Sequence, residues 1–128
     1  IQLYGVIPAG SPTAAEQQPD SYITIAPTFL GNRNPRITAP LFALSVRGDS
    51  MTGASILDGD IVFLTLREPR PRDIVAALID GESTLKRFLV QRGRPFLRAE
   101  NPHYPDLTPA AELIIQGVMV GLLRTHPH

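Results

Sequence analysis

Short runs of aliphatic and β-branched residues alternate with proline- and glycine-containing breaks along most of this chain. Thirteen prolines and ten glycines interrupt the sequence every few residues, which disfavours long helices. Short apolar runs bounded by such residues are typical of β-strands. The pattern predicts strands at residues 43–46, 60–66, 73–79, 83–90, 94–100 and 112–123.

Local turn signals refine this strand pattern. Asp80-Gly81 stands between two predicted strands, and Asp-Gly is a pair that closes β-hairpins. Gly117 is expected to bend the last strand, and the sequence SMTGASI at residues 50–56 favours one helical turn. We therefore predict a mostly β fold, in which short strands form a compact, barrel-like sheet.

The first forty residues have a different character. The stretch IPAGSPTAAEQQPDSY is small, polar and proline-rich, and it has little apolar surface to bury. Such a segment is expected to be mobile or loosely laid over the sheet. We divide the chain into an N-terminal segment and loop at residues 1–40 and a core at residues 41–128, within one domain.

Composition narrows the range of functions. The chain has 128 residues, enough for one domain with a hydrophobic core, and twelve acidic residues balance twelve basic ones. It therefore lacks the basic excess typical of a surface that binds nucleic acid or anionic membrane. No apolar stretch is long enough to span a membrane. The absence of cysteine excludes disulfides and thiolate metal sites and agrees with a reducing cytoplasm.

The start of the chain carries an expectation of its own. It begins at Ile1 rather than at methionine, and it shows no signal peptide. We therefore expect this sequence to be a trimmed or processed piece of a longer protein.

Ser50 is the first candidate for chemistry. It follows Gly48-Asp49 directly after a predicted strand, and Met51 begins the predicted helical turn. A serine in such a turn exposes its hydroxyl beside backbone N–H groups that are free to stabilise an oxyanion. The alternative is a serine that only caps the helical turn, which is a common arrangement.

A nucleophilic serine needs a base, and histidine is the usual one. His126 and His128 lie in the C-terminal tail RTHPH, and His103 in ENPHYPD has the context of a turn residue. The chain also has no G-x-S-x-G sequence. These histidines are poor candidates for the base.

Lys86 is the only lysine of the chain, beside eleven arginines. Lysine loses its proton when it is desolvated, whereas arginine stays charged. Phe88 lies on the same face of the predicted strand, so an inward-facing Lys86 would be buried. Lowering its pKa from about 10.4 by ~3 units costs the charged form roughly 4 kcal/mol, which burial can supply. A chance survival of one lysine in an arginine-rich chain is the simpler alternative.

Four motifs together carry a family resemblance. GDSM, then ILDGDIV, GESTLKRF and ENPHYPDL resemble the LexA-like self-cleaving peptidases, the S24 group. The resemblance runs from IQLYGVIPAGSP to GVMVGLLR, over nearly the whole chain. The group includes SOS and phage repressors and the UmuD subunit of a mutagenic polymerase. Its fold is mostly β and is also similar to that of type I signal peptidases.

The resemblance implies specific roles. Ser50 is similar to the family's nucleophile, Lys86 to its general base, and Ala9-Gly10 to the bond that the protein cuts in itself. It also implies a homodimer, a RecA–single-stranded-DNA filament that favours cleavage, and DNA binding only through a separate upstream helix-turn-helix domain. No metal or cofactor is implied.

Two features depart from the family pattern. Forty residues separate Gly10 from Ser50, more than the family leads us to expect, and the excess falls in the predicted loop at residues 29–40. Pro8 precedes Ala9 and removes a backbone donor that would pair with a docking strand. Small residues at the cleavage site nevertheless allow the backbone to approach the nucleophile closely.

The sequence leaves alternatives to a self-cleaving repressor domain. One is a UmuD-like accessory subunit of a translesion polymerase, and another is a dimerisation domain of a phage-type repressor that no longer cleaves. Type I signal peptidases also use a Ser–Lys pair, but they carry a membrane anchor that this stretch lacks. Lipases with a GDS block need a C-terminal histidine base, which the RTHPH tail does not offer.

Overall fold

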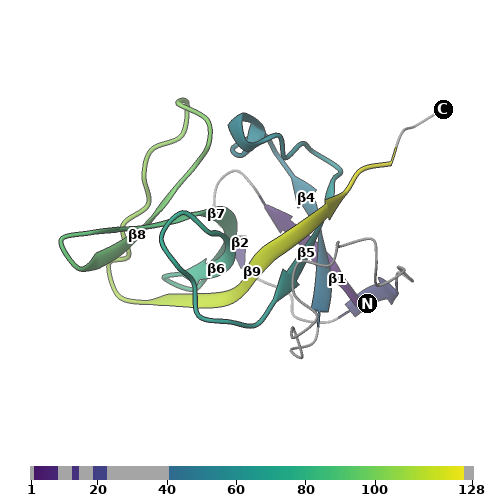
Figure 1. Ribbon diagram of the computed structural model, residues 1–128, viewed down its shortest axis with the longest axis horizontal. Coiled ribbons are helices and arrows are strands. Elements are labelled where there is room, and N and C mark those ends of the chain that lie inside the picture. The colour runs from purple at the N-terminus through teal and green to yellow at the C-terminus, as the bar shows by residue number, and fades with distance from the viewer. Residues whose placement is uncertain (1, 9–12, 15–18, 23–40, 126–128) are drawn as a thin grey trace.

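The computed structural model describes residues 2–8, 13–14, 19–22 and 41–125. Strands dominate these residues, as Figure 1 shows, and the mostly β prediction is confirmed. The elements are β1 (Gln2–Pro8), β2 (Thr13–Ala14), β3 (Pro19–Tyr22), β4 (Leu41–Arg47), the 3₁₀ helix η2 (Thr52–Ala54), β5 (Ile61–Thr65), β6 (Ile74–Ile79), β7 (Glu82–Gln91), β8 (Arg94–Arg98) and β9 (Leu113–Leu123).

The strands from β4 to β9 fall where the hydrophobic pattern placed them. The hairpin of β6 and β7 closes at Asp80-Gly81, where both residues have positive φ, 49° and 86°. Ile79 pairs with Glu82 across this two-residue turn. Positive φ at both central positions is the requirement of the tight hairpin turn that an Asp-Gly pair favours.

The long strand β9 joins the two halves of the sheet. It pairs with β6 along its first part and with β5 along its second part, and Val118 takes part in both pairings. The register with β6 shifts beside Gly117, and Figure 1 shows β9 as a curved strand. A Cβ atom at Gly117 would lie 2.8 Å from Cζ of Phe42. The predicted bend is confirmed, and glycine lets Phe42 pack against the strand.

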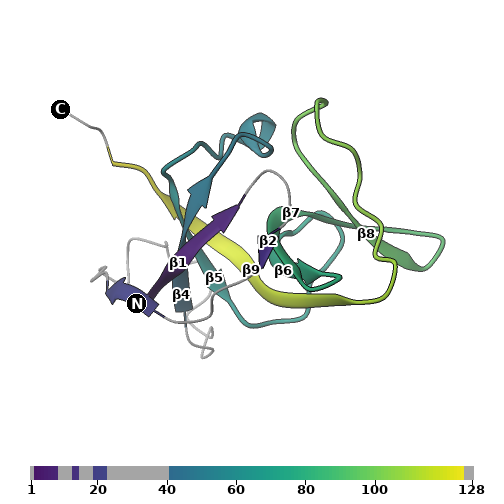
Figure 2. The ribbon, with the colours of Figure 1, turned by 180° about the vertical axis from the view of Figure 1, so that it is seen from behind.

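The strand order shows how the sheet closes on itself. The order is β2-β7-β6-β9-β5-β4-β1-β3, and β8 pairs with the other part of β7. β1 also contacts β7, so strands from the two ends of the order approach each other. Figure 2, from behind, shows β1 lying beside β4. This curvature gives the sheet the compact, barrel-like form expected from the sequence.

The N-terminal segment contributes strands that the sequence analysis did not predict. β1 runs parallel to β4, β3 is antiparallel to β1, and β2 is antiparallel to β7. β-formers at Tyr4, Val6 and Ile7 are the signal that would have indicated β1. The expected mobility of residues 1–40 and the division at residue 40 stay predictions, since much of this segment lies outside the described residues.

The sheet buries two apolar clusters. The first consists of Leu44, Val46, Met51, Ile56, Val62, Leu64, Ala76 and Leu85. The second consists of Val75, Ala77, Ile79, Phe88, Leu97 and Val118. β7 supplies Leu85 to the first cluster and Phe88 to the second, so this strand has apolar packing on both sides. Lys86 stands between these two residues.

Candidate active site

The turn that carries Ser50 begins where β4 ends. Gly48 has a φ of 102°, and its N–H donates to Oδ1 of Asp58 at 2.8 Å. A residue with a side chain is strained at that φ, so glycine allows the chain to leave the strand sharply. η2 follows at Thr52–Ala54, which confirms the helical turn predicted for residues 50–56.

Ser50 is fully buried, and its Oγ has no hydrogen-bond partner in the structure. Within the described part of the chain, the backbone N–H groups of Asp49, Ser50 and Met51 also have no acceptor. Met51 is itself buried in the first apolar cluster and anchors the turn. A buried hydroxyl therefore stands beside N–H groups that are available to bind a developing negative charge.

Lys86 is buried in the middle of β7, with a relative exposure of 1%. Its Nζ donates to Oγ1 of Thr84 at 2.7 Å, and Thr84 is itself fully buried. Burial lowers the pKa of Lys86 to about 8 because desolvation disfavours the charged amine. The expectation of a desolvated lysine is thus confirmed.

Apolar neighbours explain this desolvation. Lys86 pairs with Val75 on β6, and Val75 pairs with Val118 on β9. Both valines are fully buried, and Phe88 shares the face of Lys86 two residues further along β7. The cross-strand row around the amine is therefore apolar, and Thr84 is a polar contact within it.

The Ser50 turn and the Lys86 strand are joined through Glu100. The Gly53 N–H donates to the Glu100 carbonyl at 2.7 Å, and the Glu100 carboxylate pairs with Arg87. Because Ser50 Oγ has no hydrogen-bond partner, the Ser50 and Lys86 side chains are not hydrogen-bonded to each other.

The other residues singled out in the sequence are less informative. Ala9 and Gly10 lie outside the described residues, as do His126 and His128. His103 is exposed on a turn, in agreement with its interpretation as a turn residue. Its backbone N–H donates to Oδ1 of Asn101 at 2.9 Å.

Sequence reasoning missed three polar side chains at this site. Thr84 contacts the lysine amine, and Asn101 and Tyr104 both contact Asp49, next to Ser50. Thr84 was detectable because residues two apart on a strand share a face. The contacts to Asp49 span 52 and 55 residues, and no local pattern indicates them.

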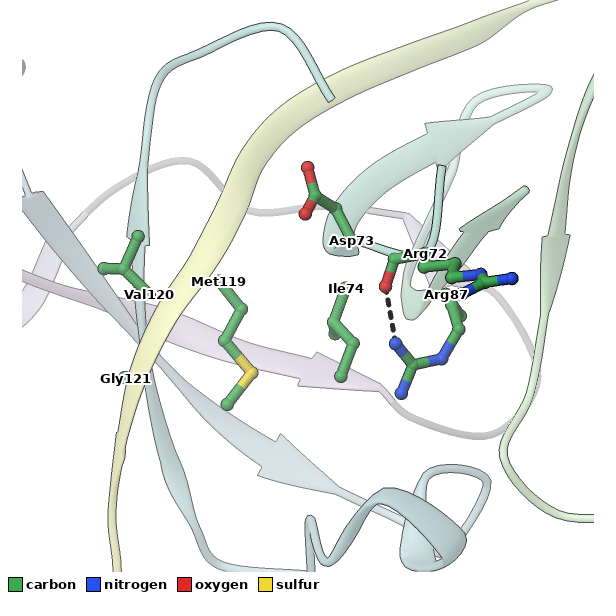
Figure 3. A pocket seen from close by; sticks show the side chains of 7 residues that line it. All are labelled: Arg72, Asp73, Ile74, Arg87, Met119, Val120 and Gly121. Atoms are coloured by element: carbon green, nitrogen blue, oxygen red, sulfur yellow. Dashed lines mark hydrogen bonds between the residues drawn. The ribbon is translucent and has the colours of Figure 1, made fainter. Parts of the chain in front are cut away.

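A cavity of about 290 Å³ opens where β6 separates from β9. It is lined by Arg72, Asp73, Ile74, Arg87, Met119, Val120 and Gly121. Figure 3 shows the Arg87 guanidinium donating to the Arg72 carbonyl inside this group. Arg87 also forms an ion pair with Glu100, so its positive charge is balanced within the protein.

No group of three or more potential metal ligands occurs among the described residues. None of their helices has the length and apolar character needed to cross a membrane.

Comparison with known proteins gives a consistent result. The sequence model of the family described as Peptidase S24-like matches residues 2–120. A LexA repressor of Verrucomicrobium spinosum is 58% identical over 126 residues, which cover 98% of this chain and 61% of that protein. A LexA repressor of Opitutus terrae is 48% identical over 124 residues, which cover 96% and 60%. The LexA repressor 1 of Nocardia farcinica is 39% identical over 125 residues, which cover 97% and 55%.

Proposed function

Since this chain belongs to the Peptidase S24-like family, we propose that it is the self-cleaving and dimerising part of a LexA-like repressor. Ser50 is the nucleophile, Lys86 is the general base, and Ala9-Gly10 is the bond cut. The observation that carries this proposal is a buried lysine with a pKa of about 8 in a fold that also buries an unpartnered serine.

The proposed reaction begins with the neutral amine of Lys86. At a pKa of about 8, roughly a tenth of the molecules carry that form at pH 7. Thr84 Oγ1 accepts one of the amine N–H groups. The nitrogen lone pair of the neutral amine is the acceptor that we assign to the proton of the Ser50 hydroxyl. Lys86 takes the hydroxyl proton as Oγ attacks the Ala9 carbonyl.

The N–H groups of residues 49–51 are the donors we assign to the resulting oxyanion. Collapse of the tetrahedral intermediate breaks the Ala9–Gly10 bond, and the Lys86 ammonium returns its proton to the Gly10 nitrogen. Ala9 is then held as an ester on Ser50. Lys86 deprotonates a water that hydrolyses this ester, which restores the serine and completes the cut.

The strands on either side of the proposed bond support cleavage within one chain. Pro8, at the end of β1, pairs with Arg47, three residues before Ser50. Thr13, at the start of β2, pairs with Ser83, three residues before Lys86. Five residue steps join these two anchors, a reach of at most about 18 Å. Attack within the chain replaces a bimolecular encounter, which is worth about 7–11 kcal/mol with good alignment.

The test is intact-mass spectrometry of residues 1–128 after incubation between pH 6 and 10. The wild type is expected to split between Ala9 and Gly10, faster as pH rises, while Ser50→Ala and Lys86→Arg stay whole. Cleavage of the Ser50→Ala protein at that bond would eliminate the proposed nucleophile. If all three proteins stay intact, adding a RecA–single-stranded-DNA filament decides between a required co-effector and a dimerisation domain without chemistry.

The role as part of a repressor rests on the relatives. They are named LexA repressors, and the chain spans about three fifths of the length of the first two. We propose that the remaining part is the DNA-binding domain and that the protein acts as a homodimer in the cytoplasm. Sedimentation of the purified chain tests the dimer. A helix-turn-helix before Ile1 would favour the repressor over a polymerase accessory subunit.

A further inference from the structure

The segment between β8 and β9 lies against the turn that carries Ser50. Its sequence, ENPHYPD at residues 100–106, helps to define the family resemblance, but the proposed reaction assigns it no task. Three of its residues contact the Ser50 turn directly: Glu100, Asn101 and Tyr104. These contacts fall on both sides of Ser50, at Asp49 and at Gly53.

Asn101 holds the backbone on the N-terminal side of Ser50. Its Nδ2 donates to the Asp49 carbonyl at 2.9 Å. Its Oδ1 accepts the N–H of His103 at 2.9 Å, which sets the direction in which the amide points. The Tyr104 N–H donates to the Asn101 carbonyl at 3.1 Å and closes the turn. The contact with His103 therefore orients the Asn101 side-chain amide toward the Asp49 carbonyl.

Tyr104 holds the side chain of the same residue. Its phenol donates to Oδ1 of Asp49. That hydrogen bond and the charge of the Asp49 carboxylate raise the pKa of Tyr104, so the phenol stays protonated and keeps donating over the pH range of cleavage. Asp49 thus accepts hydrogen bonds from this one turn of the chain at two places: its carbonyl from Asn101 and its carboxylate from Tyr104.

Glu100 holds the C-terminal side of the same turn. The Gly53 N–H donates to its carbonyl, and a Cβ atom at Gly53 would stand only 2.5 Å from that oxygen. The carboxylate of Glu100 pairs with Arg87, the neighbour of Lys86 on β7. The segment therefore links the nucleophile turn to the strand that carries the base.

We propose that Asn101 and Tyr104 are positioning residues that hold Asp49, and through it Ser50 and the adjacent N–H groups, in the geometry needed for self-cleavage. This inference rests on the proposed function. Neither residue touches the bond that is cut. Asn101 fixes the carbonyl of Asp49, whose peptide unit continues into the Ser50 N–H, and Tyr104 fixes the Asp49 side chain.

The expected loss of cleavage rate follows from how strongly that rate depends on the positions of Ser50 and the adjacent N–H groups. A misplacement of 1 Å costs about 10²-fold in rate, and loss of one oxyanion donor costs about 10²–10³-fold. Asn101→Ala leaves the Asp49 carbonyl with only the longer hydrogen bond from the Thr52 N–H, at 3.4 Å, and we expect self-cleavage to slow roughly 10–100-fold. Tyr104→Phe removes only the contact to the Asp49 side chain, and we expect a loss of about tenfold.

The experiment measures the first-order rate of self-cleavage of residues 1–128 from pH 6 to 10 by intact-mass spectrometry, with thermal unfolding of each variant. Asn101→Ala and Tyr104→Phe should lower the plateau of the pH profile but leave its midpoint near that of the wild type, since Lys86 is untouched. General loss of structure would expose Lys86 and move the midpoint upward. If the midpoint of the pH profile moves upward in both variants, the positioning role is wrong.

A matched control lies on the same segment. Arg98 and Asp106 form an exposed ion pair with N–O distances of 2.9 Å that does not contact the Ser50 turn. Arg98→Gln should therefore cleave at the wild-type rate. In an Asp49→Ala background, Tyr104→Phe should change the rate less than twofold, because its partner is already gone.

Two outcomes separate this inference from the proposed function. If Asn101→Ala and Tyr104→Phe cleave as fast as the wild type while Ser50→Ala stays whole, the positioning role is wrong and the proposed function stands. If the wild type neither cleaves nor is labelled at Ser50 by a serine-directed fluorophosphonate, the proposed function is wrong and this inference fails with it.

Discussion

Lys86 places an ionisable amine where the protein offers it little solvent. Its neighbours across the sheet, Val75 and Val118, are fully buried, and Thr84 accepts a hydrogen bond from its Nζ. The cost of keeping the charge there is what lowers its pKa. An arginine at this position would retain its proton, so only lysine combines burial with basicity at neutral pH.

This buried lysine makes the stability of the protein depend on pH. The pKa of Lys86 falls from 10.5 in its ordinary range to about 8 in the folded protein, so between these values the unfolded chain binds more protons. Stability therefore increases as pH rises through this window, by about 3 kcal/mol for this group. Urea unfolding at pH 7.5 and pH 10 should show this gain in wild type relative to Lys86→Met, and equal pH dependence in both proteins would contradict it.

Thr84 tunes the same amine. Thr84→Val keeps the shape of the side chain but removes the acceptor of the Lys86 N–H, which stabilises the ammonium more than the amine. The pKa of Lys86 should fall further, and the midpoint of the cleavage profile should move to lower pH by roughly one unit. Thr84→Ser keeps the hydroxyl and is the control. A midpoint that stays in place in Thr84→Val would show that this contact does not change the pKa of Lys86.

At the level of elements, the loop after Ser50 is tied to the end of β9. Asp60 is 1% exposed, and both of its carboxylate oxygens bind Arg124 at 2.8 Å. Arg124 also donates to the Ser55 carbonyl at 2.7 Å, just after η2. This arginine follows the last strand directly. The C-terminal end of the sheet therefore stabilises the loop that follows the Ser50 turn.

Removing the Arg124 contacts should cost stability. Arg124→Gln leaves the Asp60 carboxylate buried without its main partner, and we expect the free energy of unfolding at pH 7 to fall by more than it does in Arg98→Gln. Arg124 lowers the pKa of Asp60 below its ordinary 3.8, so the difference from wild type should shrink as pH falls through that range. Urea unfolding at pH 7 and pH 3 measures both effects.

The matched control for that variant is again Arg98→Gln. Its ion pair with Asp106 is exposed on both sides, 50% and 43%, and such pairs contribute less than about 1 kcal/mol. Equal destabilisation by the two variants would mean that burial of Asp60 contributes nothing.

At the level of the whole molecule, the N-terminal strands determine where the proposed cleavage segment lies. β1 pairs with β4 and β2 pairs with β7, so Pro8 and Thr13, on either side of the proposed bond, are both paired with strands of the core. β2 has only two residues, and a pairing of that length is weak. We therefore expect the rate of self-cleavage to scale with the fraction of molecules in which both β1 and β2 are paired with the core.

Locking β2 onto β7 tests this coupling. The chain has no cysteine, so Thr13→Cys with Ser83→Cys introduces one pair at positions that face each other in the two strands. The oxidised protein should cleave faster than the same protein after reduction, with a rate independent of protein concentration. Either single variant is the control, and slower cleavage on oxidation would contradict docking through β2.

The sequence by itself determined the strands, the hairpin turn and the chemical candidates. Strand alternation and turn residues act over a few positions, so they indicated β4 to β9, the Asp80-Gly81 turn and the bend at Gly117. A single lysine and a serine that follows a predicted strand can likewise be identified from the sequence alone. The four motifs added the family and its roles for Ser50 and Lys86.

Only the tertiary structure decided the surroundings of Lys86 and of the turn that carries Ser50. The burial of Lys86 results from packing on both sides of β7, and the contacts of Asp49 with Asn101 and Tyr104 cross more than fifty residues of chain. The pairing of β1 with β4 joins segments that local periodicity leaves unrelated. Periodicity reports which face of a strand is apolar, but which strands meet is decided by the packing of the whole sheet.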